Sequence, residues 1–228
     1  MSIIDLLATE RAVAIIRARD TRTAAEAMEA AIRGGHRILE FTMNTPGALE
    51  LIQSFAGRDG LTVGAGTVLD ADQAEAAVAR GARFLVSPVF DESVVAAATR
   101  LGVPMLPGAS TPTEMWRAHR AGVEVIKLYP APTAGPSWVR VVLGPMPFLR
   151  IVPTQGVDAG NAGAWLDAGC LAVGSGAYLF PPELLAARAW DEVEDRARSL
   201  LQAVRAWGGT AGSAAPAGGD TSRARAGT

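Results

Sequence analysis

Lysine and cysteine are nearly absent from this chain of 228 residues. Lys127 is the single lysine, so arginine supplies the other 20 of the 21 side chains of these two types. Cys170 is the single cysteine, which excludes a disulfide bond within the chain, and its place beside an apolar run indicates a buried small side chain. Histidine occurs only at His36 and His119, and neither lies at metal-ligand spacing from a cysteine or an aspartate.

Two further absences limit the possible partners. No apolar run reaches the about 18 residues that a membrane span needs, and the N-terminal stretch lacks the basic residues of a secretion signal. The formal net charge is −2, the pI is near 5.7 and no dense basic block occurs, which gives no electrostatic reason to bind nucleic acid or an anionic membrane. We therefore expect a soluble, cytoplasmic protein whose partner is a small molecule.

Composition also predicts where the folded part of the chain ends. Hydrophobic residues make up 49% of the chain, which is enough for a full-sized core in one domain. Residues 208–228 consist mainly of Gly, Ala, Ser and Pro, with few large apolar groups to offset the entropy of ordering. We predict a single folded domain over residues 1–207 and a disordered tail over residues 208–228.

Short apolar runs alternate along the domain with alanine-rich stretches that carry Glu and Arg at helical spacing. The helical stretches open with Thr or Asp and close with Gly, as in 23–35 and 70–82. Near-continuous apolar strands are typical of a parallel sheet that helices cover. Eight such units at this length predict an α/β fold, the (β/α)8 TIM barrel, with a doubly wound open sheet as the alternative. The predicted strands are 13–18, 37–43, 61–68, 83–88, 103–110, 123–130, 149–156 and 171–176.

Catalytic groups of such a barrel lie where strands end and the following loops begin. Because side chains alternate along a strand, Glu40 and Lys127 fall on faces that can point into the barrel. The polar residues near the predicted strand ends are Arg17, Glu40, Thr42, Asn44, Thr67, Ser87, Ser110, Lys127, Tyr129, Thr154, Gln155 and Ser175.

Lys127 lies inside the apolar run VEVIKLYP, where a cation is poorly solvated. Arginine serves as well as lysine for a surface charge and better for a bidentate contact, whereas only lysine supplies an amine that can lose its proton. A poorly solvated amine favours its neutral form, which can attack a carbonyl carbon to form an imine. The alternative is a structural lysine that reaches solvent or pairs with Glu124 or another acid.

Glu40 is the acidic counterpart, in the apolar run RILEFTMN. A buried carboxylate costs several kcal/mol, on the order of magnitude for burying an ion, unless it is paired or protonated. An ion pair with Arg17 or Lys127 is one interpretation. Imine chemistry also needs a group that moves protons, and a glutamate with a raised pKa fits that role.

Six motifs in order then carry a resemblance to a known family: LEFTMNTP, GAGTVLDADQAEAAVARGARFLVSP, PMLPGASTPTE, VIKLYPA, VPTQGV and AGCLAVGSG. The sequence resembles the class I 2-keto-3-deoxy-6-phosphogluconate (KDPG) and 4-hydroxy-2-oxoglutarate (KHG) aldolases over residues 8–205. The resemblance implies a (β/α)8 barrel, usually a homotrimer, and a lyase that works without a metal or another cofactor. Such enzymes cleave 2-keto-4-hydroxy acids to pyruvate and an aldehyde, which is glyceraldehyde 3-phosphate from KDPG and glyoxylate from KHG.

The resemblance also implies roles for individual residues. Lys127 forms the Schiff base with the 2-keto carbon, and Glu40 acts as general acid and base through a water molecule. Arg17 and Thr67 contact the pyruvate carboxylate and ketone. The pocket wall and the remaining substrate contacts are Pro88, Tyr129, Thr42, Asn44, Thr154, Gln155, Gly156, Gly176 and Ala177.

Three positions depart from the family pattern and leave the substrate open. Asn44 stands where many KDPG aldolases carry arginine, which resembles the 2-keto-3-deoxy-6-phosphogalactonate branch. Gln155 replaces a glycine and Ala177 replaces a serine, and both lie in the loops that hold phosphate in such barrels. In the first interpretation, the substrate is phosphorylated and backbone amides suffice to bind the phosphate, those of Gly156, Gly176 and Ala177. We expect the last two amides at the start of a short helix. In the second interpretation, the substrate is a non-phosphorylated 2-keto acid, and Gln155 binds its hydroxyl or carboxylate.

Two other functions fit the same residues. The first is a phosphate-binding isomerase or synthase, in which Glu40 abstracts a proton and Lys127 stabilises an enolate. The second is a barrel without activity that binds a keto acid as a sensor, which the presence of both Lys127 and Glu40 disfavours.

Overall fold

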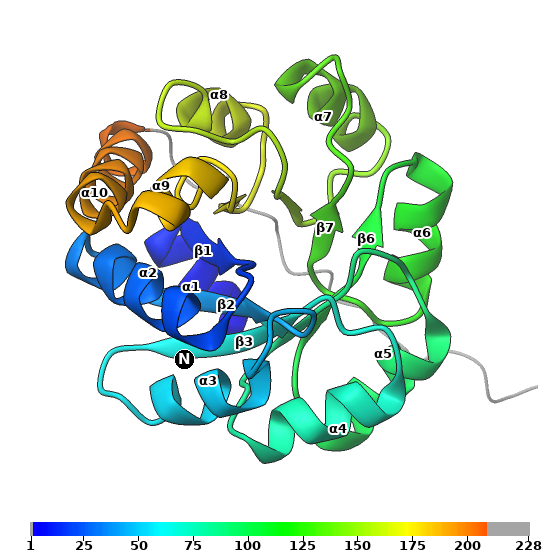
Figure 1. Cartoon of the computed structure of the whole chain (residues 1–228). Helices are drawn as coiled ribbons and strands as arrows, with labels where there is room; N and C mark the ends of the chain where they lie inside the picture. The colour runs from blue at the N-terminus through cyan, green and yellow to red at the C-terminus, as the bar shows by residue number, and fades with distance from the viewer. Residues whose placement is uncertain (1, 209–228) are drawn as a thin grey trace, which may run out of the picture.

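Short strands alternate with helices in the computed structural model, which describes residues 2–208 (Figure 1). The strands are β1 (Ala12–Ile16), β2 (Ile38–Thr42), β3 (Thr62–Gly66), β4 (Leu85–Val86), β5 (Met105–Leu106), β6 (Gly108–Ala109), β7 (Ile126–Leu128), β8 (Ile151–Pro153) and β9 (Val173–Ser175). The helices are α1 (Ile3–Glu10), α2 (Thr21–Arg33), α3 (Ala48–Phe55), α4 (Ala71–Ala79), α5 (Glu92–Leu101), α6 (Pro112–Arg120), α7 (Pro136–Leu143), α8 (Ala162–Asp167), α9 (Pro182–Ala187) and α10 (Trp190–Ala206). None of these helices is long and apolar enough to cross a membrane. The predicted disordered tail lies, apart from Gly208, outside the described residues.

The strands form a ring of parallel neighbours with the helices outside it (Figure 1). One sheet has the order β5-β4-β3-β2-β1-β9, and the other has the order β6-β7-β8. Pro107 alone separates β5 from β6, and the Leu171 N–H donates to the Ile151 carbonyl at 2.9 Å, which joins the β8 edge to the β9 edge. The fold is therefore the predicted (β/α)8 barrel. The alternative of a doubly wound open sheet is wrong, because an open sheet leaves its two outer strands unjoined.

The predicted strand at 103–110 is two strands in the structure. Pro107 has no N–H to give to a ladder, and the pairing partner changes across it, from β4 for β5 to β7 for β6. Gly108 follows at once, and a side chain there would collide with the backbone of Pro88. The break therefore brings the loop after β4 into close contact with β6, at the edge where the predicted site residues lie.

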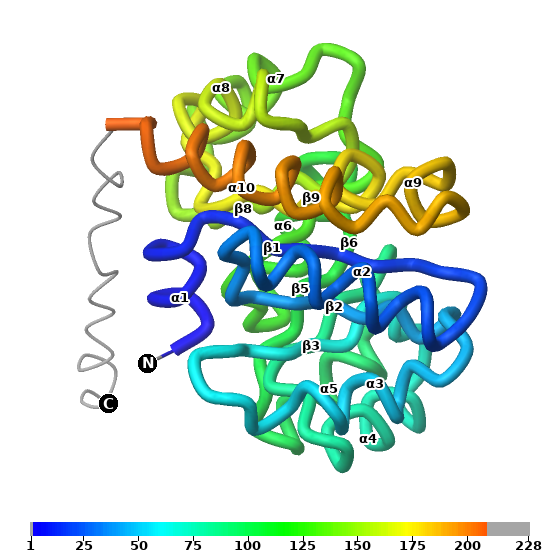
Figure 2. Tube along the Cα trace, turned by 60° about the vertical axis from the view of Figure 1, so that its left-hand side comes forward, coloured from blue at the N-terminus to red at the C-terminus, as the bar shows by residue number. Residues whose placement is uncertain are grey.

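Helix α1 closes the other end of the barrel, and the sequence analysis missed it. Ser2 and Asp5 form a capping box at its start, with 3.1 Å between each backbone N–H and the side-chain oxygen that it contacts. Ile3 and Leu7 pack into the apolar cluster inside the ring, together with Val13 and Phe84. Figure 2 shows α1 at one end of strands β1 to β3. The helix therefore keeps water away from the barrel interior on this side.

His36 is buried in the turn between α2 and β2, at the end of the barrel opposite the predicted site. Its exposed fraction is 0%, and neither ring nitrogen has a hydrogen-bond partner. Burial lowers the pKa of His36 to about 4, and the nearby cations Arg37 and Arg205 act in the same direction. The imidazole is therefore neutral in the folded protein at neutral pH.

This imidazole predicts a loss of stability in acid. The unfolded chain takes up a proton as the pH falls below the ordinary pKa of 6.5, whereas the folded protein stays neutral until about 4. The interval between these pKa values amounts to about 3 kcal/mol of unfolding free energy. We expect the H36L variant to lose this part of the pH dependence, measured as the urea midpoint between pH 7 and pH 4. H119Q, which removes the exposed histidine of α6, is the matched control and should keep it; equal pH slopes for H36L and the wild type would contradict the prediction.

Candidate active site

Lys127 and Glu40 lie in the middle of two strands and share one cavity inside the barrel. Lys127 on β7 is 7% exposed, and Glu40 on β2 is 2% exposed. The hydroxyl-bearing Thr154 lines the same cavity from the loop after β8, and Ile3 and Leu7 of α1 form its apolar floor. Its volume is about 10 Å³, close to the smallest space that holds one water molecule. The prediction that both side chains point inward is confirmed.

Glu40 lacks the contacts that normally accompany a buried carboxylate. Its Oε1 atom has no hydrogen-bond partner. Burial raises the pKa of Glu40, and the nearby charges of Lys127 and Arg17 lower it by a smaller amount. Between residues 2 and 208, no ion pair within 4.0 Å includes Glu40 or Lys127, so the structural ion pairs considered for them do not form. The raised pKa favours a protonated carboxyl group that can donate a proton.

Lys127 lies just beneath the mouth of the barrel. Its Nζ atom is 5.0 Å from the ring centroid of Tyr129, which is 38% exposed at the end of the same strand segment. Arg17 and Asn44 are exposed beyond the ends of β1 and β2. These cationic and amide groups are therefore free to meet a substrate that enters toward Lys127.

Other predicted residues at this edge have structural contacts or unusual backbone. The Thr42 hydroxyl donates to the Ile16 carbonyl at 3.1 Å and lies 3.1 Å from the Thr45 hydroxyl, so it joins β2 to β1. Thr67 follows β3 with a φ of 57°, a left-handed conformation that is uncommon for a β-branched residue. Such strain is concentrated at functional sites. Serine hydroxyls at the strand ends are also engaged, those of Ser87, Ser110 and Ser175.

Comparison with known proteins assigns the chain to a family. The family model for KDPG and KHG aldolase matches residues 3–196. The chain belongs to the KDPG/KHG aldolase family. It is 32% identical over 206 residues to the 2-dehydro-3-deoxy-phosphogluconate aldolase of Treponema pallidum. The alignment covers 90% of this chain and 98% of that protein.

Two Escherichia coli proteins and a crystal structure give further comparisons. The KHG/KDPG aldolase is 30% identical, with 88% of this chain and 95% of that protein covered. The 2-dehydro-3-deoxy-6-phosphogalactonate aldolase is 29% identical, with 86% and 93% covered. KDPG aldolase from Legionella pneumophila, solved with pyruvate captured as a covalent carbinolamine intermediate, has a TM-score of 0.80 at 25% identity, with 88% of this chain and 98% of that chain covered. Members of the family named in these comparisons are aldolases, so the chain is an aldehyde-lyase of the (β/α)8 type.

The loop after β8 holds three of the predicted substrate contacts of this aldolase. Gln155 is exposed, and its Oε1 atom accepts a hydrogen bond from the Ala131 N–H at 3.2 Å, which leaves the amide NH2 group to face a ligand. Gly156 has a φ of 67°, and its carbonyl accepts from the Asn161 side chain at 2.8 Å. The Thr154 hydroxyl is buried without a partner. The donor that this loop presents at its exposed surface is therefore the NH2 group of Gln155.

The loop after β9 differs from the prediction. Gly176 and Ala177 were expected at the start of a short helix, but residues 177–179 form a single turn that the Phe180 N–H closes on the Gly176 carbonyl at 2.8 Å. Pro181 and Pro182 follow, and neither has an N–H with which to continue the helix. Helix α9 therefore begins only at Pro182, and no helix dipole points at Ala177.

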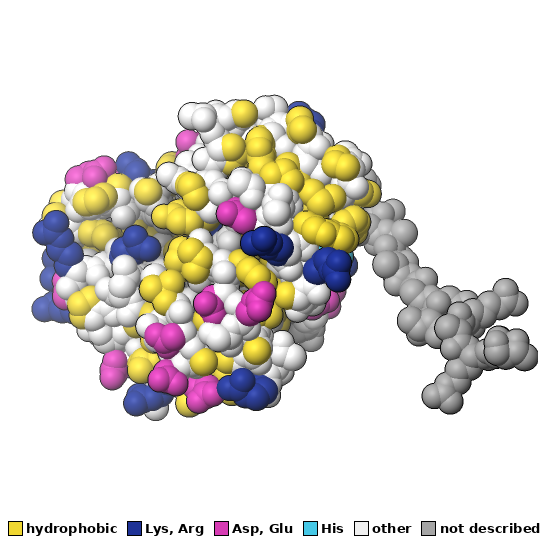
Figure 3. All heavy atoms as spheres, turned by 90° about the vertical axis from the view of Figure 1, so that its right-hand side faces the viewer, with side chains coloured by type: hydrophobic (Ala, Val, Ile, Leu, Met, Phe, Trp, Pro, Cys, Tyr) yellow, Lys and Arg dark blue, Asp and Glu magenta, His cyan; other side chains and the backbone are white. Residues whose placement is uncertain are grey.

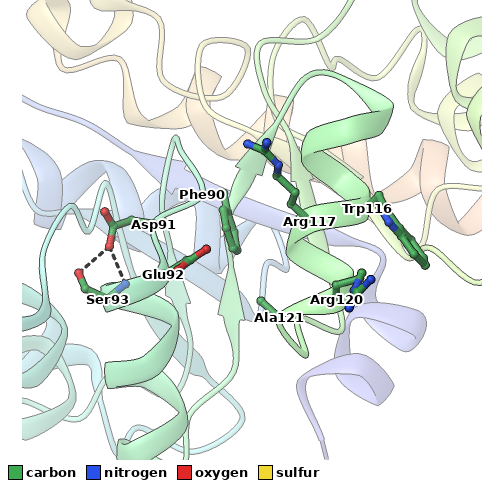
Figure 4. A pocket seen from close by; sticks show the side chains of 8 residues that line it. All are labelled: Phe90, Asp91, Glu92, Ser93, Trp116, Arg117, Arg120 and Ala121. Carbon is green, nitrogen blue, oxygen red and sulfur yellow. Dashed lines mark hydrogen bonds between the residues drawn. The ribbon is translucent and has the colours of Figure 1, made fainter.

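A wide surface cleft lies elsewhere, between α5 and α6 on the outside of the barrel (Figure 4). Its volume is about 1000 Å³, and its walls carry Asp91 and Glu92 on one side and Arg117 and Arg120 on the other. None of the predicted site residues lines it. Because Lys127 and Glu40 lie inside the barrel, the cleft is not the site of the aldolase chemistry.

An exposed aromatic group lies beside this cleft. Trp116 is 44% exposed and Phe148 is 39% exposed, and their ring centroids are 6.1 Å apart. The ring centroid of His119 is 5.9 Å from that of Trp116 and 4.6 Å from that of Phe148. Figure 3 shows hydrophobic side chains gathered on the upper part of the side that carries α6. All five tryptophans lie in helices or directly at a helix end: Trp116, Trp138, Trp165, Trp190 and Trp207.

Proposed function

We propose that this protein is a class I aldolase that forms a Schiff base through Lys127 and moves protons through Glu40. The observation that carries the proposal is the shared cavity, which a buried amine and a buried carboxyl group both line without forming an ion pair. A covalent carbinolamine of pyruvate in the Legionella relative supports imine chemistry in the family. The rival isomerase or synthase needs no covalent bond to the lysine.

The proposed reaction balances with these two side chains alone. The neutral amine of Lys127 adds to the C2 ketone, and protonated Glu40 gives its proton to the departing hydroxyl, so that water leaves and an iminium ion forms. The Glu40 carboxylate then takes the proton of the C4 hydroxyl. The C3–C4 bond breaks, its electron pair moves to the iminium, and an aldehyde and an enamine result.

Product release uses the same proton in the opposite direction. Glu40 protonates the enamine at C3, which regenerates the iminium ion. Water adds to C2 and returns a proton to Glu40, and the carbinolamine collapses to pyruvate and free Lys127. The raised pKa of Glu40 suits a group that must both give and take a proton in every turnover.

For the substrate, we propose a 2-keto-4-hydroxy acid of the KDPG or KHG type, with the phosphogalactonate analogue as the alternative. The loop after β8 favours KHG, because the NH2 group of Gln155 suits a carboxylate and its side chain occupies the place of a glycine. The homotrimer and the cytoplasmic location stay predictions, and the exposed Trp116 and Phe148 support a contact between subunits.

Replacing Gln155 with glycine tests the substrate class. We expect the Q155G variant to shift the ratio of kcat/KM for KDPG over KHG upward by about tenfold or more, the size expected for one hydrogen bond to a charged group. The wild type measured with KDPG, KHG and the phosphogalactonate analogue provides the reference. A large wild-type advantage for both phosphorylated sugars would contradict the preference for KHG and leave the aldolase proposal intact.

Trapping of the imine tests the aldolase proposal itself. Incubation with pyruvate and borohydride should add one reduced pyruvate to the intact protein, and digestion should place it on the peptide that contains Lys127. The rival isomerase or synthase predicts no adduct. Because Lys127 is the single lysine, the N-terminal amine is the main competing site, and the peptide map separates the two.

A further inference from the structure

The carboxyl group of Glu40 lies against the backbone of β3 at Gly66. A Cβ atom at Gly66 would overlap Oε1 of Glu40 and lie 2.6 Å from its Cδ and 2.8 Å from its Cγ. Side chains essentially never approach so closely. Gly66 is buried, and its carbonyl accepts a hydrogen bond from the Met43 N–H at 2.7 Å, next to its pairing with Thr42 of β2. The space that Glu40 occupies therefore exists because position 66 has no side chain.

Glycine at this position is not required by the backbone. Gly66 is not among the glycines with positive φ between residues 2 and 208, and it is paired with Thr42 in regular parallel register. Alanine can adopt this conformation, so the cost of a methyl group falls on whatever it touches. The three nearest atoms are Oε1, Cδ and Cγ of Glu40, so the methyl group would displace this side chain and its carboxyl group.

We propose that Gly66 is a positioning residue for proton transfer, which holds open the place of the Glu40 carboxyl group beside the bound pyruvate. This inference rests on the proposed function. Its chemical content is one proton transfer, in which the Glu40 carboxylate removes a C3 proton from the pyruvate iminium on Lys127, gives the enamine, and returns a solvent-derived proton to C3. Displacement of the carboxyl group slows this transfer and leaves Lys127 in place.

The test compares two alanine substitutions on the same face of the same strand. We expect G66A to lower the rate of deuterium exchange at C3 of pyruvate by about 10²-fold or more, the lower range for loss of a general base, while borohydride still traps pyruvate on Lys127. G64A is the matched control. The three atoms nearest to a Cβ atom there all belong to the ring of Phe84, whereas at Gly66 they all belong to Glu40, so G64A should lower the melting temperature without slowing exchange at C3.

A shorter acid supplies the rescue. In the G66A background, E40D removes one methylene and draws the carboxyl group back from the new methyl, so we expect the double variant to exchange C3 protons faster than G66A alone. In the wild-type background, E40D should be slower than the wild type. This reversal is a signature that loss of stability cannot produce.

Two outcomes overturn the inference, and both differ from failure of the proposed function. Exchange in G66A at the wild-type rate, or exchange that falls equally in G66A and G64A, shows that Gly66 does not position the base. Failure of the wild-type protein to trap pyruvate would instead remove the Schiff-base proposal, and it is measured before either variant is made.

Discussion

The K127R variant is expected to lose at least about 10⁴-fold in kcat/KM for cleavage and to trap no pyruvate on the peptide that contains residue 127. Arginine keeps the positive charge and most of the length of the side chain. A guanidinium group stays protonated in proteins and cannot add to a ketone. The size of the loss follows from the removal of a covalent nucleophile, for which no other side chain between residues 2 and 208 in the cavity can substitute.

The control for this variant is a measurement of stability. Lys127 is 7% exposed and contacts the ring of Tyr129, so a larger cation in the same cavity can lower stability. A second variant, K127M, removes the charge and the nucleophile and suits the apolar surroundings. Loss of cleavage in both variants, with an urea midpoint in K127M at or above that of the wild type, assigns the effect to chemistry. Cleavage by K127R at the wild-type rate would contradict the proposed mechanism.

The sequence predicts the ring of strands because each strand carries its own local signal. Apolar runs separated by alanine-rich helices predict a parallel sheet, whatever the order of the strands within it. The presence of eight strand–helix units then favours closure of the sheet into a barrel. The inward direction of Glu40 and Lys127 follows from the same period of two, since each lies in the middle of a short strand. These features depend on residues that are near neighbours in the chain.

Features that depend on contacts between distant segments are the ones that the sequence analysis missed. The room for Glu40 comes from Gly66, 26 residues further along the chain, and no local pattern links the two. Helix α1 has a local signal, the capping box of Ser2 and Asp5, but its role as the floor beneath Lys127 appears only when β7 closes the ring. The turn at Ala177 was wrongly predicted as a helix start because the two prolines that end it lie beyond the motif.

The E40Q variant is expected to lose about 10²- to 10⁴-fold in kcat, the range for removal of a general acid and base, and to keep a trapped imine. Glutamine has the shape of the acid and fits the space beside Gly66, so the change is confined to the proton. Trapping should become slow as well, because Glu40 also protonates the hydroxyl that leaves the carbinolamine. The measurement is kcat together with the time course of borohydride trapping. A rate of cleavage within threefold of the wild type would show that another group moves the proton.

Stability against pH gives an independent measure of the same carboxyl group. Burial raises the folded pKa of Glu40 above its ordinary value of 4.5, so above that pH the unfolded chain releases a proton that the folded protein keeps. The unfolding free energy of the wild type therefore falls as the pH rises from 4.5 toward the folded pKa, and the contribution is lost above it. The glutamine of E40Q does not titrate, so the difference in urea midpoint between E40Q and the wild type should grow with pH across this interval. The contribution of His36 is common to both proteins and cancels in this difference. A difference that stays constant with pH would mean that Glu40 is ionised in the folded protein and cannot donate the proton that imine formation requires.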